Sequence, residues 1–200
     1  MPFLPSLPDE AHLSDLFRRF PDHVRPLMAY TDSLLRGPGE LSIGERELVA
    51  SFVSGLNACH FCHHSHRIYA ETFGIDGDLI DALLEDIDTA PVTPKLRPLL
   101  HYVKKLNTLP SRLVPADAEA VFAAGWSERA LYEAASIAGL FNMMNRIVEG
   151  CGINFDYTAH PEHHPAADRD PARQAHSYGR FGARTLETAP DEREGPPAAP

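Results

Sequence analysis

Apolar residues recur every three or four positions along most of this chain, which is the spacing that places them on one face of an α-helix. A capping box from Ser42 to Glu45 opens one helix, and a Gly-Pro-Gly sequence at 37–39 marks a loop. No stretch alternates apolar and polar residues as a half-buried strand does. We therefore predict an all-α fold. The expected helices cover residues 13–20, 24–35, 42–53, 58–74, 75–87, 94–106, 115–124 and 127–149.

The composition is that of an ordinary globular protein, with 44% hydrophobic and 23% charged residues. The net charge of −10 and the lack of a basic stripe make nucleic acid and anionic membrane poor partners. The first ten residues lack the basic and apolar regions of a signal peptide, and no apolar run is long enough to cross a bilayer. We expect a cytoplasmic protein with no nucleic-acid or membrane partner.

The two ends of the chain differ in composition from its middle. Residues 1–10 carry three prolines and are expected to form an extended N-terminal arm. Residues 11–158 carry the helical periodicity and are the expected helical domain. Residues 159–200 hold seven of the 18 prolines, many charges and few large apolar residues, so we predict a disordered or loosely docked tail. Within it, the patch from Tyr178 to Phe181 is able to pack on a neighbouring surface.

The stretch from Glu47 to His66 concentrates the reactive side chains, with two of the three cysteines and four of the eleven histidines. Cys59, Cys62 and His66 stand at i, i+3 and i+7 and share one face of a helix. Asn57 is a suitable N-cap for that helix, which places both cysteines in its first turn. Free backbone N–H groups and the helix dipole favour a thiolate there. The stretch therefore predicts a reactive dithiol.

A cysteine pair of this spacing has three interpretations. In the first, peroxide oxidises a thiolate to a sulfenic acid, which the second thiol resolves. His66 would accept or relay the thiol proton, and Glu47 would complete the relay if its helix packs antiparallel to the cysteine helix. In the second, the cysteines bind zinc with a nearby histidine, although no closing ligand pair follows. In the third, they are inert buried thiols. His60, His63 and His64 point in different helical directions and are expected to be solvated or at a subunit interface.

Polar residues also interrupt the apolar pattern of the longest expected helix. Asn142, Asn145 and Arg146 need partners if they are buried. They either line a pocket, join helices through hydrogen bonds or contact another subunit. Cys151 follows the glycine that ends this helix and is predicted to be a small buried apolar side chain.

The order of these residues resembles a known family. Eleven residues separate Glu47 from Cys59, two separate Cys59 from Cys62, and three separate Cys62 from His66. This pattern is similar to that of the AhpD-like alkylhydroperoxidases of the carboxymuconolactone decarboxylase superfamily. The resemblance covers most of residues 10–155 and does not extend to the tail. Further segments look like the peroxidase-related branch of this superfamily: 94–97, 124–126 and 141–152.

The resemblance implies an all-helical bundle that assembles into homo-oligomers, either trimers or hexamers. It implies that Cys62 is the thiolate that takes the peroxide oxygen and that Cys59 is the resolving partner and proton donor. His66 and Glu47 would form the proton relay. The implied activity is that of a thiol-dependent hydroperoxidase or disulfide reductase, with a hydroperoxide substrate, a thiol or dithiol reductant, and no cofactor or metal. One position departs from the pattern, since Phe61 stands where some members have a histidine between the cysteines.

Two other functions stay open at this point. An enzyme of the same fold would perform proton transfer on a small carbon substrate through Glu47 and His66, although the decarboxylase branch lacks the cysteine pair. A non-enzymatic oligomer would sense a metal or the redox state through Cys59, Cys62 and a histidine.

Overall fold

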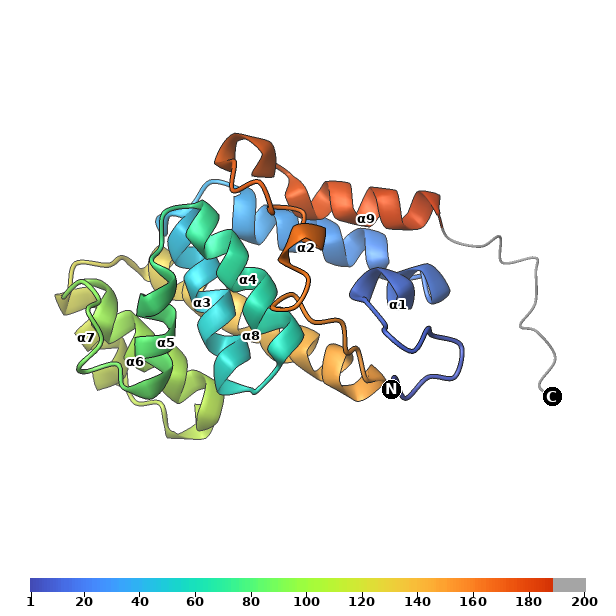
Figure 1. The fold of residues 1–200 in the computed structure, drawn as a ribbon. Coiled ribbons are helices and arrows are strands. Elements are labelled where there is room, and N and C mark those ends of the chain that lie inside the picture. The colour runs from blue at the N-terminus through green and yellow to red at the C-terminus, as the bar shows by residue number, and fades with distance from the viewer. Residues whose placement is uncertain (189–200) are drawn as a thin grey trace.

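The computed structural model describes residues 1–188 of the 200-residue chain, and these hold nine α-helices, three short 3-10 helices and no strand (Figure 1). The predicted all-α class is confirmed for these residues. None of their helices combines the length and the apolar character that a membrane crossing requires. The helices are α1 (Leu13–Arg19), α2 (Val24–Arg36), α3 (Ile43–Leu56), α4 (His60–Thr72), α5 (Gly77–Glu85), α6 (Leu96–Thr108), η1 (Pro110–Arg112), α7 (Pro115–Ala123), α8 (Glu128–Cys151), η2 (Pro161–His163), η3 (Pro171–Gln174) and α9 (Ser177–Glu187).

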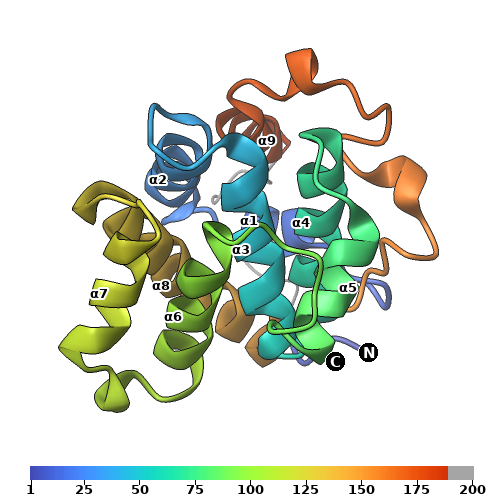
Figure 2. The same cartoon turned by 90° about the vertical axis from the view of Figure 1, so that its left-hand side faces the viewer.

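Helix α3 is the centre of the molecule, with α2, α4, α6 and α8 packed around it (Figure 2). Every residue from Gly44 to Ser54 except Glu45 is buried. A helix that is buried on all sides is held by apolar contacts around its whole axis, and the fully buried Phe52 is one of the largest of them. The same position buries Glu47, so this carboxylate must find partners inside the protein.

The turn between α3 and α4 differs from the prediction. Asn57 ends α3 instead of capping the cysteine helix, and Cys59 is the N-cap of α4. The N–H of Ala58 donates to the Gly55 carbonyl at 2.9 Å. The N–H of Cys59 donates to the Ser54 carbonyl, also at 2.9 Å, which completes the Schellman arrangement that closes a helix. Ala58 adopts the left-handed conformation that this arrangement requires, with a φ of 54°.

The segment from 159 to 188 is folded, whereas its composition predicts a disordered or loosely docked tail. It contains η2, η3 and α9, and α9 lies side by side with α2 in both views (Figure 1, Figure 2). Two large side chains of this segment, Gln174 and Tyr178, are buried. They anchor a stretch that is otherwise mostly polar. The remainder of the predicted tail, 189–200, lies outside the described residues, and the division at residue 158 stays a prediction.

The N-terminal segment before α1 runs along the C-terminal end of α8. The N–H of Phe3 donates to the Cys151 carbonyl at 3.0 Å, and the N–H of Ala11 donates to the Asn154 side chain at 2.8 Å. A turn at residues 5–6 makes this segment less extended than the arm that its prolines predict. Its hydrogen bonds hold the start of α1 against the end of α8.

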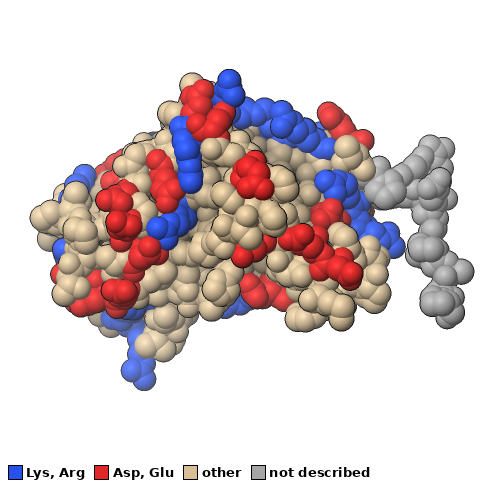
Figure 3. Space-filling model, in the orientation of Figure 1, with Lys and Arg blue, Asp and Glu red and all other residues tan. Residues whose placement is uncertain are grey.

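Charged side chains of both signs are scattered over the face of the molecule seen in Figure 3, most of which is formed by other residues. Acidic groups are scattered over most of this face, and basic groups gather along the edge that α9 forms. This face therefore presents no continuous surface of a single charge.

Two glycines of α9 provide a matched test of how closely this helix packs on α2. A Cβ added at Gly182 would lie 2.8 Å from side-chain atoms of Met28, whereas at Gly179 the nearest atom is Cγ of Asp32 at 3.8 Å. Alanine favours a helix over glycine by about 1 kcal/mol at either position. The difference in stability between the two alanine variants therefore reports the clash with Met28. We expect Gly182→Ala to be less stable than Gly179→Ala by about 1–3 kcal/mol in urea unfolding. Equal stabilities would show that α9 is not closely packed on α2.

Candidate active site

Helices α3 and α4 pack against each other along their lengths, and Glu47 of α3 and His66 of α4 meet between them. The Nδ1 atom of His66 lies 2.6 Å from Oε2 of Glu47. Both side chains are buried, with exposed fractions of 8% for His66 and 0% for Glu47. Because a carboxylate only accepts hydrogen bonds, His66 donates its Nδ1–H to Glu47, so in the neutral ring Nε2 is the acceptor. The two residues of the predicted relay are therefore in direct contact.

The second oxygen of Glu47 binds two side chains that the sequence analysis did not select. Arg36 Nη1 donates to Oε1 at 2.5 Å, and the Tyr178 hydroxyl donates to the same oxygen at 2.7 Å. Arg36 is the last residue of α2, where a basic side chain usually faces solvent. Tyr178 lies in the segment predicted to be loose. No spacing in the sequence links either residue to Glu47, and only the packing of α2 and α9 reveals them.

The Arg36 guanidinium is enclosed by protein, with only 1% of its side chain exposed. It lies over the rings of Tyr69, Phe73 and Tyr178, with 5.0, 5.2 and 4.7 Å to their centroids. These aromatic faces attract a cation that has lost its water. Its Nε atom donates to the Gln174 carbonyl at 3.0 Å. Its Nη1 atom also donates to the Leu35 carbonyl at 3.2 Å, so the buried positive charge is held by one carboxylate, three rings and two carbonyls.

The electrostatics of this cluster keep Glu47 ionised. Burial alone would raise the pKa of Glu47, but the charge of Arg36 and the contact with His66 outweigh it and lower that pKa to about 2. Burial and the Glu47 charge hold the pKa of Tyr178 well above its usual value, so its hydroxyl stays protonated and donates. The cluster is therefore a fixed anion surrounded by donors.

The two cysteines of the motif are free thiols that differ in their surroundings. Cys59 is fully buried and Cys62 is 3% exposed. A hydrogen bond with Cys62, together with burial, raises the pKa of Cys59 well above that of an ordinary thiol, so Cys59 keeps its proton. Cys62 lies in the first turn of α4, which has no side-chain cap on its backbone N–H groups. Only Cys62 reaches the cavity beside His66.

This cavity has a volume of about 70 Å³ and no Lys, Arg, Asp or Glu in its wall. Its inner wall comes from α2, α4 and α8, and its outer wall comes from the two ends of the described chain. Such a space suits a small uncharged group next to the Cys62 sulfur. The lining residues are His12, Leu13, Met28, Thr31, Phe61, Cys62, Ser65, His66, Tyr69, Phe141, Met144, Tyr157, Pro165, Tyr178 and Phe181.

Solved structures with this fold place the chain among known proteins. One is an uncharacterized peroxidase-related protein from Silicibacter sp. TM1040, with 28% identity and a TM-score of 0.60 over 64% of this chain and 66% of its own. Another is an alkylhydroperoxidase AhpD core from Ralstonia eutropha JMP134, also an uncharacterized peroxidase-related protein. It has the same identity and TM-score over 67% of this chain and 70% of its own. These two structures support placing the chain with the AhpD-like, peroxidase-related proteins at moderate identity.

The family resemblance seen in the sequence is therefore confirmed. The match spans just under two thirds of the length of the Silicibacter protein. No protein-family model and no curated protein matches the chain.

Two histidines of the AhpD-like chain support the outer wall of the cavity in their neutral form. His12 Nε2 lies 2.6 Å from the Tyr157 hydroxyl. His164 Nδ1 accepts from the Ala166 N–H at 3.0 Å, so its Nε2–H is free to donate to Ser65, 3.0 Å away. Burial lowers the pKa of His12 to about 4 and that of His164 to about 3. No motif in the sequence indicated either residue, because their contacts join segments that are far apart in the chain.

The histidines near the cysteines do not share one environment. His60 is exposed and His64 is half-buried, but His63 is only 7% exposed, unlike the solvated or interface residue that was predicted. Its Nδ1–H donates to the Ser51 carbonyl at 3.0 Å, and the Ser51 hydroxyl donates to the His63 carbonyl at 3.0 Å. His63 therefore joins α4 to α3 and stays away from the cavity.

Hydrogen bonds between helices explain the asparagines of α8. Asn57 donates to Asn145 at 2.9 Å and accepts from Asn107 at 2.9 Å. Asn142 donates to Asn107 at 2.6 Å. The predicted joining of helices is seen for Asn142 and Asn145, and Asn142 and Arg146 also line a surface pocket beside α6. This network holds the turn before the cysteines against α6 and α8.

Neither cysteine is part of a metal-binding group within residues 1–188. The cluster of three potential ligands in that range contains His160, Glu162 and His163 and no cysteine. The arrangement therefore gives no support to a sensor that holds a metal through Cys59, Cys62 and a histidine.

Removing one member of the central ion pair should be far more damaging than removing both. Arg36→Met leaves Glu47 as a buried charge without its cation, which costs about 3–5 kcal/mol of unfolding free energy. The double variant Arg36→Met/Glu47→Gln should recover most of that loss, measured by urea unfolding. Arg173→Met, which removes an ion-paired arginine that is 72% exposed, is the control and should cost at most about 1 kcal/mol. A double variant as unstable as Arg36→Met would contradict this account.

Acid should destabilise the outer wall. A histidine in the unfolded chain has a pKa of about 6.5, so it binds a proton before the buried His12 and His164 do. Each histidine therefore contributes stability that is complete above about pH 6.5 and is lost as the pH falls toward the folded pKa. We expect a loss of up to about 3 kcal/mol per histidine between pH 6.5 and 4 in urea unfolding. The variant His164→Asn should show a smaller loss over this range, and an unchanged loss would contradict the assignment.

Proposed function

We propose that this AhpD-like protein is a thiol-dependent hydroperoxidase or disulfide reductase that cycles between a dithiol and a disulfide. In either use the dithiol gives two electrons to the substrate, and a reductant restores it. The observation that carries the proposal is the shared cavity of Cys62 and His66, with Glu47 fixing His66 from behind. A sulfur beside a base in a largely dry space is what a thiolate attack on a peroxide requires.

The proposed cycle begins with transfer of the Cys62 proton to Nε2 of His66. The thiolate attacks the terminal oxygen of the hydroperoxide, a sulfur–oxygen bond forms, and the oxygen–oxygen bond breaks. The leaving alkoxide takes the proton from His66 and departs as an alcohol. Cys59 then attacks the Cys62 sulfenic acid, forming the disulfide and releasing its proton with the hydroxide as water. A thiol or dithiol reductant supplies two electrons and two protons to restore both thiols.

The different environments of the cysteines support this division of roles. Cys62 faces the cavity, where a peroxide would arrive, and Cys59 lies beneath it without exposed surface. Because its raised pKa keeps Cys59 protonated, it is suited to wait as the resolving thiol while Cys62 reacts.

In this proposal Glu47 orients His66 and does not itself carry the proton. A carboxylate with a pKa of about 2 is too weak a base to take a proton near neutral pH. The same weakness counts against a cysteine-independent, decarboxylase-like reaction that uses Glu47 as the base. Phe61 offers no proton, and its ring packs against the rings of His12 and Tyr157, each 5.2 Å away between centroids. The relay therefore rests on His66.

Serine variants of the three cysteines test the proposal. With an organic hydroperoxide and dithiothreitol, Cys62→Ser should lose turnover by at least about 100-fold, because no thiolate remains in the cavity. In a separate reaction without dithiothreitol, Cys59→Ser should consume one equivalent of peroxide and stop at the sulfenic acid, which a 1,3-dione probe traps and intact mass detects. Cys151→Ser is the control and should keep full turnover, since Cys151 is half-buried at the end of α8 and outside the cavity.

Full turnover by Cys62→Ser would overturn the proposal. A trapped sulfenic acid in Cys62→Ser, with none in Cys59→Ser, would reverse the two roles. The expected trimer or hexamer, the identity of the reductant and the cytoplasmic location stay predictions.

A further inference from the structure

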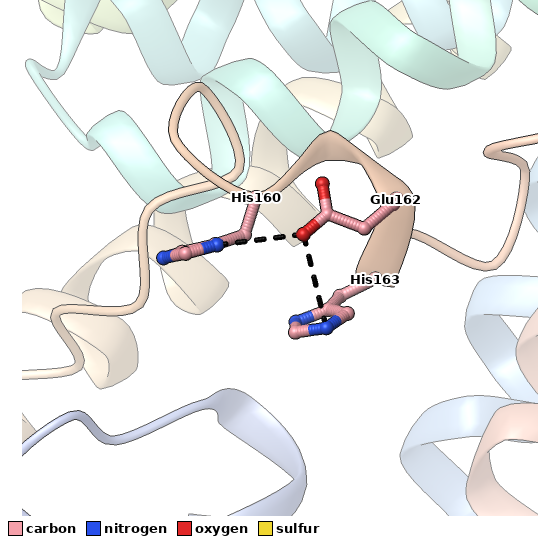
Figure 4. A group of neighbouring side chains, drawn as sticks. All are labelled: His160, Glu162 and His163. Atoms are coloured by element: carbon pink, nitrogen blue, oxygen red, sulfur yellow. Dashed lines mark ion pairs between the residues drawn. The ribbon is translucent and has the colours of Figure 1, made fainter.

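A second group of reactive side chains lies on η2, apart from the cavity (Figure 4). Oε1 of Glu162 is 3.5 Å from Nδ1 of His160 and 3.9 Å from Nε2 of His163. In a 3-10 helix, residues three positions apart lie one above the other, so both histidines project from the same side. Figure 4 shows the carboxylate of Glu162 directed at both rings. The ligand atoms of all three residues lie within 4.8 Å of one another.

This donor set and its spacing match a metal site. A tetrahedral zinc ion with bonds of about 2.0–2.2 Å holds its ligand atoms roughly 3.3–3.6 Å apart, close to the distances seen here. Two imidazoles and one carboxylate suit Zn²⁺, Ni²⁺ or Cu²⁺, whereas Mg²⁺ and Ca²⁺ prefer oxygen ligands alone. We infer that His160, Glu162 and His163 form a binding site for a divalent transition-metal ion, separate from the proposed reaction centre and beyond the proposed function.

The two rings are already held together before any ion binds. His160 and His163 stack with centroids 5.6 Å apart and ring planes 15° apart. Phe155 packs against both of them, at 5.8 Å and 5.9 Å. Phe155 is itself packed against the hydrophobic core, and Pro161 restricts the backbone at the start of η2. A pre-ordered pair of ligands loses less conformational freedom when it binds an ion.

A second carboxylate faces the far side of His160. Oε1 of Glu10 lies 3.9 Å from Nε2 of His160, while Nδ1 of the same ring faces Glu162. A histidine that binds a metal through one nitrogen commonly directs the N–H of the other toward a carboxylate. Glu10 comes from the N-terminal segment, so a bound ion would link that segment to the stretch that follows α8.

The position of the site ties it to the outer wall of the cavity. Its residues lie between Tyr157 and Pro165, both of which line the cavity. A bound ion would restrain the stretch that carries these two residues.

Calorimetric titration with Zn²⁺ tests the inference. The full chain with Cys59→Ser, Cys62→Ser and Cys151→Ser serves as the background, so that thiols do not bind the ion and peroxide turnover plays no part. We expect about one equivalent of Zn²⁺, with an affinity that falls at least about tenfold when His160→Ala and His163→Ala are added. Glu162→Gln should weaken binding in the same direction.

His23→Ala is the matched control, because His23 is an exposed histidine at the start of α2, outside the cluster. It should leave the affinity unchanged. Absence of Zn²⁺ binding by the background protein would overturn the inference. So would an unchanged affinity in both the histidine double variant and Glu162→Gln, or an equal loss in His23→Ala.

Discussion

The burial of Glu47 in the central helix is the constraint on which the rest of the site depends. A carboxylate at this depth is stable only if it is paired with a cation and its oxygens are hydrogen-bonded. Arg36 and Tyr178 bind one oxygen and His66 binds the other. These three partners come from α2, α9 and α4. Satisfying one buried charge therefore fixes three helices around α3, and it orients His66 at the same time.

The same constraint explains why a polar, proline-rich segment is folded. Its composition suggests too little apolar surface to offset the entropy of ordering it. Its contribution, however, is concentrated in two places: the Tyr178 hydroxyl bonds to Glu47, and the Gln174 carbonyl accepts from Arg36. Hydrogen bonds to buried charges contribute about 1.5–3 kcal/mol each, more than ordinary neutral ones. A prediction of disorder from average composition does not take account of two individual contacts of this kind.

Sequence reasoning succeeded where the signal is local or periodic and failed where the partner is distant. The Ser42 capping box begins α3 as predicted. Asn57 is equally suited to begin a helix or to end one. The left-handed position that follows the end of α3 is occupied by Ala58 and not by the glycine that usually marks it. The prediction that Asn57 begins the cysteine helix was therefore wrong. The class of fold followed from periodicity alone. Arg36 and Tyr178 were missed because their roles depend on how α2 and α9 pack against α3.

Tyr178 belongs both to the wall of the cavity and to the hydrogen bonds around Glu47. The two sides of the cavity therefore differ in the hydrogen-bond energy that is lost when they separate. The ring of Tyr178 lines the cavity and its hydroxyl bonds to Glu47. Moving α9 away breaks a hydrogen bond to a buried charge, worth about 1.5–3 kcal/mol, and also exposes the Arg36 cation. Separating His12 from Tyr157 breaks a hydrogen bond between neutral groups, worth about 0.5–1.5 kcal/mol. Separating His12 from Tyr157 therefore costs less in hydrogen-bond energy than moving α9, and it leaves the Glu47–His66 contact intact.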